Sequence, residues 1–466
     1  MTTRRDQAQA QTYVLGRLNS ALVIGDPEAQ EGPHRRILVG VIAGLLVSAL
    51  VVAGFLVYGL LWPGGATTWR APKTLVVEKE TGSRYILANG FLHPVHNYAS
   101  AVLLLGADLK VVSVSSESLR STPRGTPVGI VGAPDSLPDP DALAQTVWSV
   151  CAMSDRGEDG EPVPATTLAV GRSVFGSALT DEHGLLARTS DRTFLVWHGH
   201  RYELTADWVP EALGFDAPPL QVEPGWLNQL PAGPDIGPLS VPGRGGKGPT
   251  VDGAATRIGQ VFLTRVIGSG KRYYVLFSDG LSRLSATAAA LVLADPRTAD
   301  AYGSERVAPT ELTPAALTGL PKSKRSTLSA GAPETPPRPA IRPADTTWCV
   351  RTAVPDGYID VAAEPAASDA NLRLTRDGPG VTRTARTAEA VGVVGGAGGA
   401  VRAGRPGGVG GSQLYLVTDS GMSYPFADPA VAKAMGYEPT DAFPIPPALL
   451  ALLPTGPTLD PNAARG

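Results

Sequence analysis

The chain has 466 residues, of which 43 % are hydrophobic and 18 % are charged, and its formal net charge at pH 7 is −3. A nucleic-acid binder would show a basic face, so this balance of charge excludes a nucleic-acid partner. The length exceeds one ordinary hydrophobic core, and several domains are therefore predicted.

The first predicted element is a short amphipathic helix in an N-terminal arm that covers residues 1–36. Its apolar residues recur with helical spacing on one face, and they are Val14, Leu15, Leu18, Ala21 and Leu22. Such a helix either packs on a partner or lies on the bilayer. Because a helix of about ten residues is marginal by itself, an unbound tail is the alternative.

A membrane-spanning helix is predicted from Ile37 to Trp62. The run carries no charged side chain and can cross a hydrocarbon core of about 30 Å with some tilt. A cleaved signal peptide would have a shorter apolar core nearer the N-terminus, so an uncleaved anchor is favoured. Arginines gather before the span, at Arg4, Arg5, Arg17, Arg35 and Arg36. By the positive-inside rule, the arm is expected in the cytoplasm and the rest of the chain outside it.

Small residues repeat every four positions within the predicted span, at Gly40, Gly44 and Ser48. This spacing lets a second membrane helix approach closely, and it predicts a helix-packing face. Glycine is common in membrane helices in general, so an ordinary membrane helix is the alternative.

Four later segments share one pattern of an aromatic and β-branched run, a tight turn and a second short run. They are SRYILANGFLHPV around Gly90, RTFLVWHGHRYEL around Gly199, RYYVLFSDGLSRL around Gly280 and QLYLVTDSGMSYPF around Gly421. Each glycine stands where a hairpin turn requires a positive φ, which glycine reaches without a steric penalty. Each segment is therefore predicted to be a β-hairpin.

A short helix is predicted after these hairpins. Asp207, Ser285 and Asp428 precede alanine-rich turns as helix N-caps, and Asp428 is followed by a proline suited to the first turn. Gly214 and Gly436 are placed to end their helices in a left-handed conformation. With the proline-punctuated tails that follow, the pattern predicts four copies of a small hairpin-plus-helix module.

The only two cysteines, Cys151 and Cys349, both lie beyond the span, where oxidation is permitted. We expect them to pair, and closing so long a loop would stabilise the fold by about 5 kcal/mol in the chain-entropy model. Two separately buried thiols are the alternative, because free cysteine is a common core residue. The stretches around them, VWSVCA and TTWCVRT, are alike and predict two halves of one core.

The order of these features predicts a tandem duplication, in which a module, a core half and a second module occur twice. Two segments rich in proline and glycine, from Pro242 and from Gly331, are predicted to be unpacked linkers. The predicted divisions are a cytoplasmic arm at 1–36, a transmembrane helix at 37–62, repeat 1 at 70–140, the core first half at 145–190, repeat 2 at 191–245, repeat 3 at 255–330, the core second half at 345–410 and repeat 4 at 411–460.

Two segments approach the nucleotide-binding P-loop pattern, which needs a glycine-rich loop followed by lysine, a hydroxyl residue and a helix. GSGKRYYV at Gly268 lacks the first glycine and the final hydroxyl, and it occupies the position of a repeat turn. GRGGKGPT from Gly243 has Pro249 where a helix should begin. We therefore expect neither segment to bind ATP.

The histidines offer only pairs, His93 with His96 and His198 with His200. Two ligands make no metal site without a third imidazole, thiol or carboxylate, and polar residues are usual at hairpin turns. No serine or cysteine stands in a nucleophile motif. The sequence therefore predicts no catalytic residue, no cofactor and no metal, and so no enzyme.

The whole chain resembles the EccB family, a membrane core component of the actinobacterial type VII (ESX) secretion system. The resemblance rests on an arm with RRDQ, Tyr13 and Arg17, on one span, four repeats and two cysteines, and on the segment RYILANGFLHPVHNYASAVLLLG from Arg84. It implies a single-pass inner-membrane protein with a cytoplasmic N-terminal helix. Its extracytoplasmic α+β region would have a β-rich core, braced by a Cys151–Cys349 disulfide and flanked by repeats in quasi-twofold arrangement.

The resemblance also implies a function and partners. The function is that of a structural and assembly subunit, and the partners are an FtsK-like ATPase, a polytopic channel subunit and further copies of this chain. A glycine-rich segment near residues 391–411 departs from the family pattern. One alternative is a membrane-anchored protein that binds cell wall, which exposed aromatic residues at Tyr85, Trp197, Tyr273 and Tyr415 would favour. An envelope ATPase is the third hypothesis.

Overall fold

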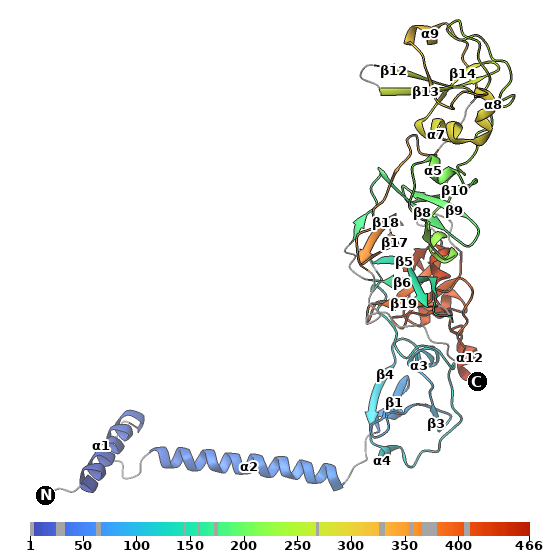
Figure 1. Cartoon of the computed structure of the whole chain (residues 1–466). Helices are drawn as coiled ribbons and strands as arrows, with labels where there is room; N and C mark the ends of the chain where they lie inside the picture. The colour runs from blue at the N-terminus through green and yellow to red at the C-terminus, as the bar shows by residue number, and fades with distance from the viewer. Residues whose placement is uncertain are drawn as a thin grey trace. The chain divides into compact units, whose positions relative to one another are not determined.

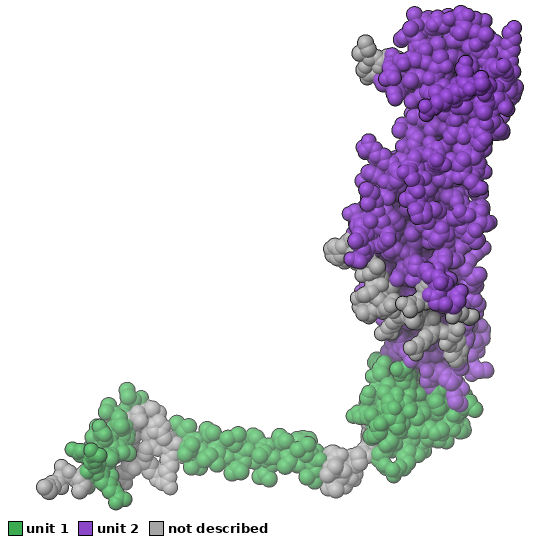
Figure 2. Space-filling model, viewed as in Figure 1, with its two compact units in different colours: residues 1–94, 110–126 green, residues 95–109, 127–466 purple. Residues whose placement is uncertain are grey.

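The computed structural model describes residues 4–24, 33–61, 67–143, 146–156, 159–171, 176–266, 270–325, 331–353, 358–365, 380–404 and 411–466 (Figure 1). It forms two compact units (Figure 2). The first unit consists of residues 1–94 and 110–126, and the second of residues 95–109 and 127–466. Trp62, at the end of the predicted span, and Gly268 lie outside the described residues.

Two helices begin the first unit, α1 (Arg4–Ile24) and α2 (Pro33–Leu61). The five apolar side chains predicted on one face of α1 are all exposed, as an unpartnered amphipathic face would be. In α2, the 22 residues Ile37–Tyr58 have a mean hydropathy of 2.7. Of the helices described, only this one is long and apolar enough to cross a membrane.

A four-stranded sheet follows in the first unit. It contains β1 (Thr74–Glu78), β2 (Arg84–Ala88), β3 (Phe91–Pro94) and β4 (Lys110–Val114), with η1 (Thr68–Arg70) before it and α4 (Ser116–Leu119) after it. The strand order is β3-β2-β1-β4, and only the β1 and β4 pair is parallel. The largest buried side chain beside this sheet is Trp69 of η1, which clusters with Val76 of β1 and Leu119 of α4. The apolar face of the sheet forms a small core of its own.

Three sheets of the second unit have the same arrangement. Their strands are β8 (His183–Arg188), β9 (Thr193–Trp197), β10 (His200–Leu204) and β11 (Leu220–Gln221); β12 (Val261–Val266), β13 (Gly270–Phe277), β14 (Gly280–Leu284) and β15 (Thr310–Glu311); and β20 (Gly399–Ala403), β21 (Leu414–Val417), β22 (Ser423–Pro425) and β23 (Phe443–Ile445). The orders are β10-β9-β8-β11, β14-β13-β12-β15 and β22-β21-β20-β23. In each, the last strand pairs in parallel with the first.

The short helices of the second unit are α3 (Tyr98–Leu105), α5 (Val209–Ala212), α6 (Pro224–Leu227), α7 (Ala286–Ala294), η2 (Pro296–Thr298), α8 (Ala299–Tyr302), α9 (Pro314–Thr318), α10 (Pro429–Ala434), η4 (Pro439–Asp441), α11 (Pro447–Leu450) and α12 (Pro461–Arg465). Ser285 caps α7 by accepting from Ala288 N, and Asp428 caps α10 by accepting from Val431 N. The prediction that Asp207 caps α5 is wrong. Trp208 holds the cap position without a side-chain bond, because the proline in the first turn fixes where this helix begins.

The four turn glycines all have positive φ, at 82° for Gly90, 66° for Gly199, 132° for Gly280 and 79° for Gly421. Their surroundings differ. A Cβ at Gly280 would lie 2.1 Å from the carbonyl oxygen of Pro321, whereas a Cβ at Gly90 would meet no atom within 4 Å. The third hairpin therefore needs glycine at position 280 for two reasons: the positive φ and the close approach of the backbone at Pro321.

This difference predicts that Gly280→Ala destabilises the chain more than Gly90→Ala. Both variants bear the cost of a left-handed alanine, about 1 kcal/mol or more, and only Gly280→Ala also displaces backbone. We expect a further loss of about 1–3 kcal/mol in the free energy of unfolding at Gly280, measured by urea denaturation of each variant. Equal losses in the two variants would contradict the close approach.

A six-stranded sheet forms the centre of the second unit. Its strands are β5 (Val147–Arg156), β6 (Pro162–Val170), β7 (Ser177–Ala178), β17 (Thr346–Ala353), β18 (Ile359–Pro365) and β19 (Ala390–Val393), in the order β19-β6-β5-β17-β18-β7. The hairpins β5–β6 and β17–β18 meet through their first strands, and each half sends its outer strand to the far edge of the other half. The two exchanged strands differ in direction, because β7 is antiparallel to β18 whereas β19 is parallel to β6.

Two of the four similar sheets begin earlier than the predicted divisions. Residues 183–188 fall within the range expected for the first core half, yet as β8 they pair with β9. Residues 399–403 fall within the expected second core half, yet as β20 they pair with β21. The hairpin pattern marks only two strands of each sheet, and these two preceding segments contain glycine, so they resemble connections between the core and the next hairpin.

Both predicted linkers are packed, so that prediction is wrong. In the first, Gly245 N donates to Ile258 O at 2.9 Å and Gly248 N donates to Thr256 O at 2.8 Å. In the second, β16 (Arg338–Pro339) pairs in parallel with β8. Proline is tolerated on an edge strand when the residues between prolines supply the N–H groups, and here Arg338 and Ala340 both donate to the β8 side.

Candidate functional site

The cystine lies at the centre of the six-stranded sheet. Cys151 on β5 and Cys349 on β17 are directly opposite each other in the antiparallel register and form a disulfide between residues 198 apart in sequence. Both are buried, at 6 % and 0 % exposure. The predicted pairing is confirmed, and it joins the two halves of the core at their line of contact.

The two faces of this sheet differ in chemistry, since side chains alternate along each strand. One face is apolar and centres on Trp148, Val150 and Trp348, all buried. The face that carries the cystine is polar: Ser149 Oγ donates to Glu364 Oε1 at 3.1 Å, and Arg351 Nε donates to Asp360 Oδ1 at 2.7 Å. The hydrogen bond to Asp360 raises the pKa of Arg351 above its ordinary value despite partial burial.

The described residues hold one group of three candidate metal ligands, namely Cys151, Cys349 and Glu364. The two sulfurs are bonded to each other, and metal binding by cysteine requires free thiolates. This group therefore offers a cation only its carboxylate, and the cystine face is a structural site.

The second and fourth modules dock on the apolar face of the core. Trp226 in α6 is fully buried and its Nε1 donates to the Trp348 carbonyl oxygen at 3.1 Å. Leu449 in α11 belongs to the same apolar core. The side chain of Gln229 links the two helices, because its Nε2 donates to the Ala448 carbonyl oxygen at 3.2 Å.

The helix α3 packs on the fourth module. Ala99 and Val102 share a buried cluster with Phe426 and Met435, and the amide of Ala107 donates to the carbonyl oxygen at the end of α10 at 3.2 Å. This joint connects residues near opposite ends of the chain. Sequence periodicity does not reveal such a contact, because α3 reads as an ordinary buried helix.

The helix α7 makes the corresponding joint with the second module. Leu291 is fully buried together with Leu195 and Val209, which belong to β9 and α5. The amide of Thr287 donates to the Glu334 carbonyl oxygen at 3.1 Å, so the proline-rich segment also closes over this joint. The helices that follow the first and third hairpins thus pack on the fourth and second modules, respectively.

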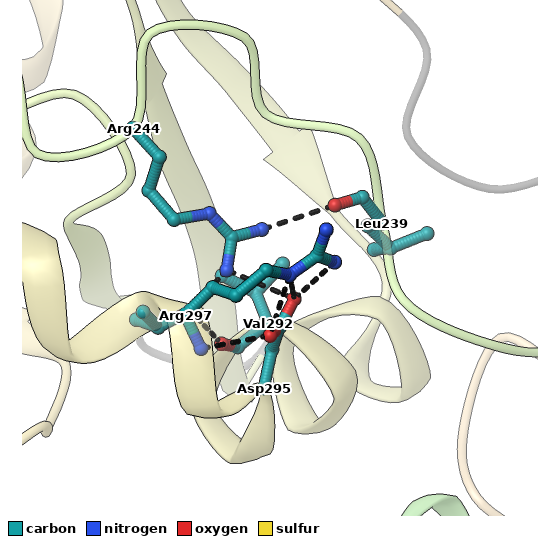
Figure 3. A network of polar contacts seen from close by, with 6 residues as sticks. Leu239, Arg244, Val292, Asp295 and Arg297 are labelled. Carbon is teal, nitrogen blue, oxygen red and sulfur yellow. Dashed lines mark hydrogen bonds and ion pairs between the residues drawn. The ribbon is translucent and has the colours of Figure 1, made fainter. Parts of the chain in front are cut away.

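A buried ion-pair network fixes the end of α7 (Figure 3). Arg244 Nη1 lies 2.9 Å from Asp295 Oδ2, and their side chains are only 9 % and 2 % exposed. Arg244 also donates to the Thr298 hydroxyl and to the Leu239 carbonyl oxygen, while Arg297 donates to both carboxylate oxygens of Asp295. The predicted linker around Arg244 is therefore bound to the third module.

The electrostatics of this network follow from its geometry. Burial by itself would raise the pKa of Asp295, but hydrogen bonds from Arg297 and the charge of Arg244 outweigh it and hold that pKa below its ordinary value. Sequence reasoning missed this group. Its only signal was an arginine in a glycine-rich segment, which resembles a linker residue when its partner is unknown.

A pocket of about 930 Å³ lies beside the second hairpin. His198 stacks on Trp197 at a centroid distance of 4.0 Å, and its Nε2 lies 3.2 Å from Asp181 Oδ1. His200 Nδ1 is 2.8 Å from the His198 carbonyl oxygen. The histidine pair predicted to serve the turn is thus bound to protein groups of that turn, and His93 Nδ1 in the first sheet similarly meets the Thr126 carbonyl oxygen at 2.9 Å.

The segments that approach a P-loop adopt other structures where they are described. Lys271 lies on β13 and pairs with Arg265 of β12, so a strand and not a helix follows Gly270. Lys247 forms an isolated antiparallel bridge with Arg257. Among the described residues, neither lysine is followed directly by a helix.

The four aromatic residues that would favour cell-wall binding are not exposed. Tyr85 is 8 % exposed and buried in the first sheet. Trp197, Tyr273 and Tyr415 are half-buried, and the indole Nε1 of Trp197 donates to the Asp181 carbonyl oxygen. The row of exposed aromatic side chains that would favour the cell-wall alternative is therefore not found at these four positions, which pack against buried clusters.

The small-residue face of α2 is open. A Cβ at Gly40 or at Gly44 would meet no atom within 4 Å, and Ser48 is exposed. The face is therefore available to another membrane helix, and packing there remains a prediction.

Comparison with known proteins gives consistent matches. The family described as "Type VII secretion system ESX-1, transport TM domain B", EccB, matches residues 1–466. The "ESX-2 secretion system ATPase EccB2" of Mycobacterium tuberculosis is 27 % identical over 485 residues, covering 99 % of this chain and 94 % of that protein.

Two solved structures share the fold. The periplasmic assembly from the ESX-5 inner membrane complex matches with a TM-score of 0.67 and 23 % identity, over 87 % of this chain and 97 % of that one. The EccB3 dimer from the ESX-3 core complex matches with a TM-score of 0.62 and 23 % identity, over 84 % and 99 %. With its single apolar helix and cystine-centred α+β region, the chain belongs to the EccB family of type VII secretion proteins.

Proposed function

We propose that this chain is a structural and assembly subunit of a type VII secretion complex in the inner membrane. The observation that carries the proposal is the family match over residues 1–466, which includes the arm, the apolar helix and the whole cystine-braced region. The relatives belong to ESX secretion systems, and solved structures with this fold come from ESX membrane complexes. The proposed partners are an FtsK-like ATPase, a polytopic channel subunit and further copies of this chain.

The proposed topology places α2 across the inner membrane, with α1 in the cytoplasm and residues after 67 outside it. The arginines before the span support this orientation through the positive-inside rule. The disulfide supports it independently, because structural disulfides persist in oxidising compartments.

The architecture supports a bracing role. The two core halves exchange their outer strands, α3 packs on the fourth module, which is distant in sequence, and α7 packs on the second module. We propose the predicted domain divisions as a working division of one duplicated scaffold, with the second and fourth modules beginning at β8 and β20. Such a region resists separation of its parts, as a load-transmitting subunit requires.

Co-purification tests both the function and the small-residue face of α2. We expect the chain, extracted in mild detergent, to bring down an FtsK-like ATPase and a polytopic membrane protein. Gly40→Leu with Gly44→Leu should reduce that recovery about tenfold, since two bulky side chains prevent close helix approach. The control, Ala49→Leu with Ala53→Leu, places the same leucine side chains on the opposite face of α2 and should leave recovery unchanged. Recovery of the chain alone from cells that contain the secretion system would refute the function.

Hydrolysis of ATP is the second candidate, because the relatives are named ATPases. We infer that this chain acts without it, since Lys271 and Lys247, the lysines of the P-loop-like segments, lie on a paired strand and at a bridge. The test is phosphate release by the purified chain. Hydrolysis that is lost in Lys271→Ala or Lys247→Ala, while the unfolding midpoint stays unchanged, would establish the enzyme.

A further inference from the structure

The pocket of about 930 Å³ lies between the β9–β10 hairpin and the proline-rich segment from Gly331. The hydroxyl of Tyr202 donates to the Gly331 carbonyl oxygen at 3.1 Å, so the segment is tied to the hairpin at the wall of the pocket. The amide of Arg338 donates to the Glu182 carbonyl oxygen at 2.8 Å and holds the segment again where it joins β8. Protein pockets that hold ligands commonly have volumes of about 300–1,000 Å³, so this pocket has room for more than one side chain.

Four aromatic side chains from the end of the hairpin line one wall of the pocket: Trp197, His198, His200 and Tyr202. The ring centroids of Trp197 and Tyr202 are 6.1 Å apart, and those of His200 and Tyr202 are 6.4 Å apart. His198 stacks on Trp197, and its own side chain is 41 % exposed. His200 is exposed as well. The rings therefore form one continuous group, and its two imidazoles are open to a ligand.

The charged side chains of the pocket are mostly acidic. Its carboxylates are those of Asp181, Glu182 and Glu334, and its guanidinium is that of Arg338. Glu182 lies 3.9 Å from Arg338. Asp181 meets the His198 ring, which is charged only if protonated, and among the described residues the Glu334 carboxylate makes no ion pair or hydrogen bond. The pocket thus has an excess of negative charge that a cationic ligand would offset.

The hydrogen-bonding groups of the pocket are mainly acceptors. A carbonyl oxygen only accepts, so His200 Nδ1, at 2.8 Å from the His198 carbonyl oxygen, carries the proton, and Nε2 of the neutral ring is left as an acceptor. In the same way His198 Nε2 donates to the Asp181 carboxylate, and its Nδ1 is left as an acceptor. Some of the lining residues have no N–H group at all, namely Pro234, Pro336 and Pro337. Such a lining suits a ligand that is rich in donors.

We propose that this pocket binds an arginine side chain presented by a peptide segment of a partner protein. A guanidinium group has five N–H donors and no acceptor, keeps its charge at physiological pH, and stacks on aromatic rings. Lysine fits less well, because its compact ammonium has three donors and no planar face. A neutral sugar also fits less well, because its hydroxyl groups need donors, and the indole N–H of Trp197 is already bonded to the Asp181 carbonyl oxygen.

In the proposed topology the pocket lies outside the membrane, so the arginine would belong to an extracytoplasmic segment of the partner. Sequence reasoning missed this pocket, because the prolines of its wall are typical of a linker and its histidines are typical of a turn. Binding here requires no other subunit of the secretion complex. Its failure would therefore leave the proposed structural function untouched.

The test is calorimetric titration of the full chain in detergent with blocked pentapeptides of the form Gly-Ser-X-Ser-Gly, where X is arginine, citrulline or lysine. Citrulline has nearly the shape of arginine and no charge, so it isolates the guanidinium charge. We expect the arginine peptide to bind at one site per chain, about tenfold more tightly than the citrulline peptide and about threefold more tightly than the lysine peptide.

Three results would overturn the proposal. The first is equal affinity for the arginine and citrulline peptides, or no binding of either at concentrations up to about 10 mM, the range of the weakest specific contacts. The second is agmatine that binds as tightly as the arginine peptide, which would assign the pocket to a small cation. The third is binding of tri-N-acetylglucosamine in place of the peptides, which would assign it to a glycan.

Variants of the pocket locate the binding site. Asp181→Asn with Glu334→Gln should weaken binding of the arginine peptide about tenfold, and His200→Ala, which removes one ring, should weaken it about threefold. All three residues are exposed, so the unfolding midpoint should stay within about 2 °C of the wild type. Glu211→Gln, which changes an exposed carboxylate of α5 in the same module, is the control and should bind as the wild type does. Unchanged binding in Asp181→Asn with Glu334→Gln would place the peptide elsewhere and contradict the proposal.

Discussion

Replacing both Cys151 and Cys349 by serine is expected to lower the unfolding midpoint of the full chain by about 5 °C or more. The disulfide links residues 198 apart in sequence, so its loss restores a large loop to the unfolded state. Native disulfides typically contribute about 2–5 kcal/mol. The effect should be near the upper end, because β5 and β17 are the only direct contact between strands of the two core hairpins in the described sheet order.

The comparison that isolates the cross-link uses four samples of the full chain in detergent: the wild type, the reduced wild type, the double serine variant and Ser149→Ala. Circular dichroism during heating gives the unfolding midpoint of each. The double serine variant should have a lowered unfolding midpoint. The wild type should show the same lowered midpoint once its disulfide has been reduced in the unfolded state. Ser149→Ala, on the same face of the sheet, removes one hydrogen bond and should cost only about 1 kcal/mol. A serine variant that melts with the wild type would show that the sheet holds its halves together without the bond.

Local patterns predicted the hairpins and the cystine because each depends on few residues. Asn89 and His198 have φ values of 52° and 49°, and each forms a tight turn with the glycine that follows it. The Asn-Gly and His-Gly dipeptides predict these turns. The two cysteines were the only candidates for a cross-link. The single apolar run at α2 likewise needs no tertiary information, because its composition alone allows a membrane span.

Features that depend on distant partners were missed or misjudged. The segment from Gly331 reads as a linker by composition, yet its carbonyl and amide groups find partners on β8 and α7. Tyr85 and its counterparts read equally well as exposed or as buried, since aromatic residues suit either face of a strand. The packing of α3 on the fourth module joins segments that are hundreds of residues apart, and no local period records such a contact.

The two misjudged linkers share one physical cause. Proline has little backbone freedom to lose on ordering, whereas glycine has the most, so contacts with a neighbouring sheet decide whether such a segment is ordered. Arg244 illustrates the point, because it stands among glycines and still makes the most buried ion pair of the third module. Composition predicts how flexible an isolated segment would be. Contact with a neighbouring module determines whether that segment is ordered in the folded chain.

Asp295→Asn is expected to destabilise the full chain by about 3–5 kcal/mol, because it leaves the buried Arg244 guanidinium without a counter-charge. Arg244 keeps hydrogen bonds to Thr298 and Leu239, so the loss comes from electrostatics and not from empty space. Arg297→Ala is the control: its side chain is 60 % exposed, and its removal should cost about 1 kcal/mol or less. Urea denaturation, followed by fluorescence, measures both.

The pH dependence of the same pair distinguishes electrostatics from packing. The pKa of Asp295 is held below its ordinary value in the folded chain, so its contribution is complete above about pH 4, the value for an unfolded aspartate. That contribution is lost as the pH falls through the lowered pKa. The difference in unfolding free energy between the wild type and Asp295→Asn should therefore be constant from about pH 5 to 8 and shrink below about pH 4. A difference that persists unchanged at pH 3 would mean that Asp295 acts through hydrogen-bond geometry, which asparagine fails to reproduce, and not through its charge.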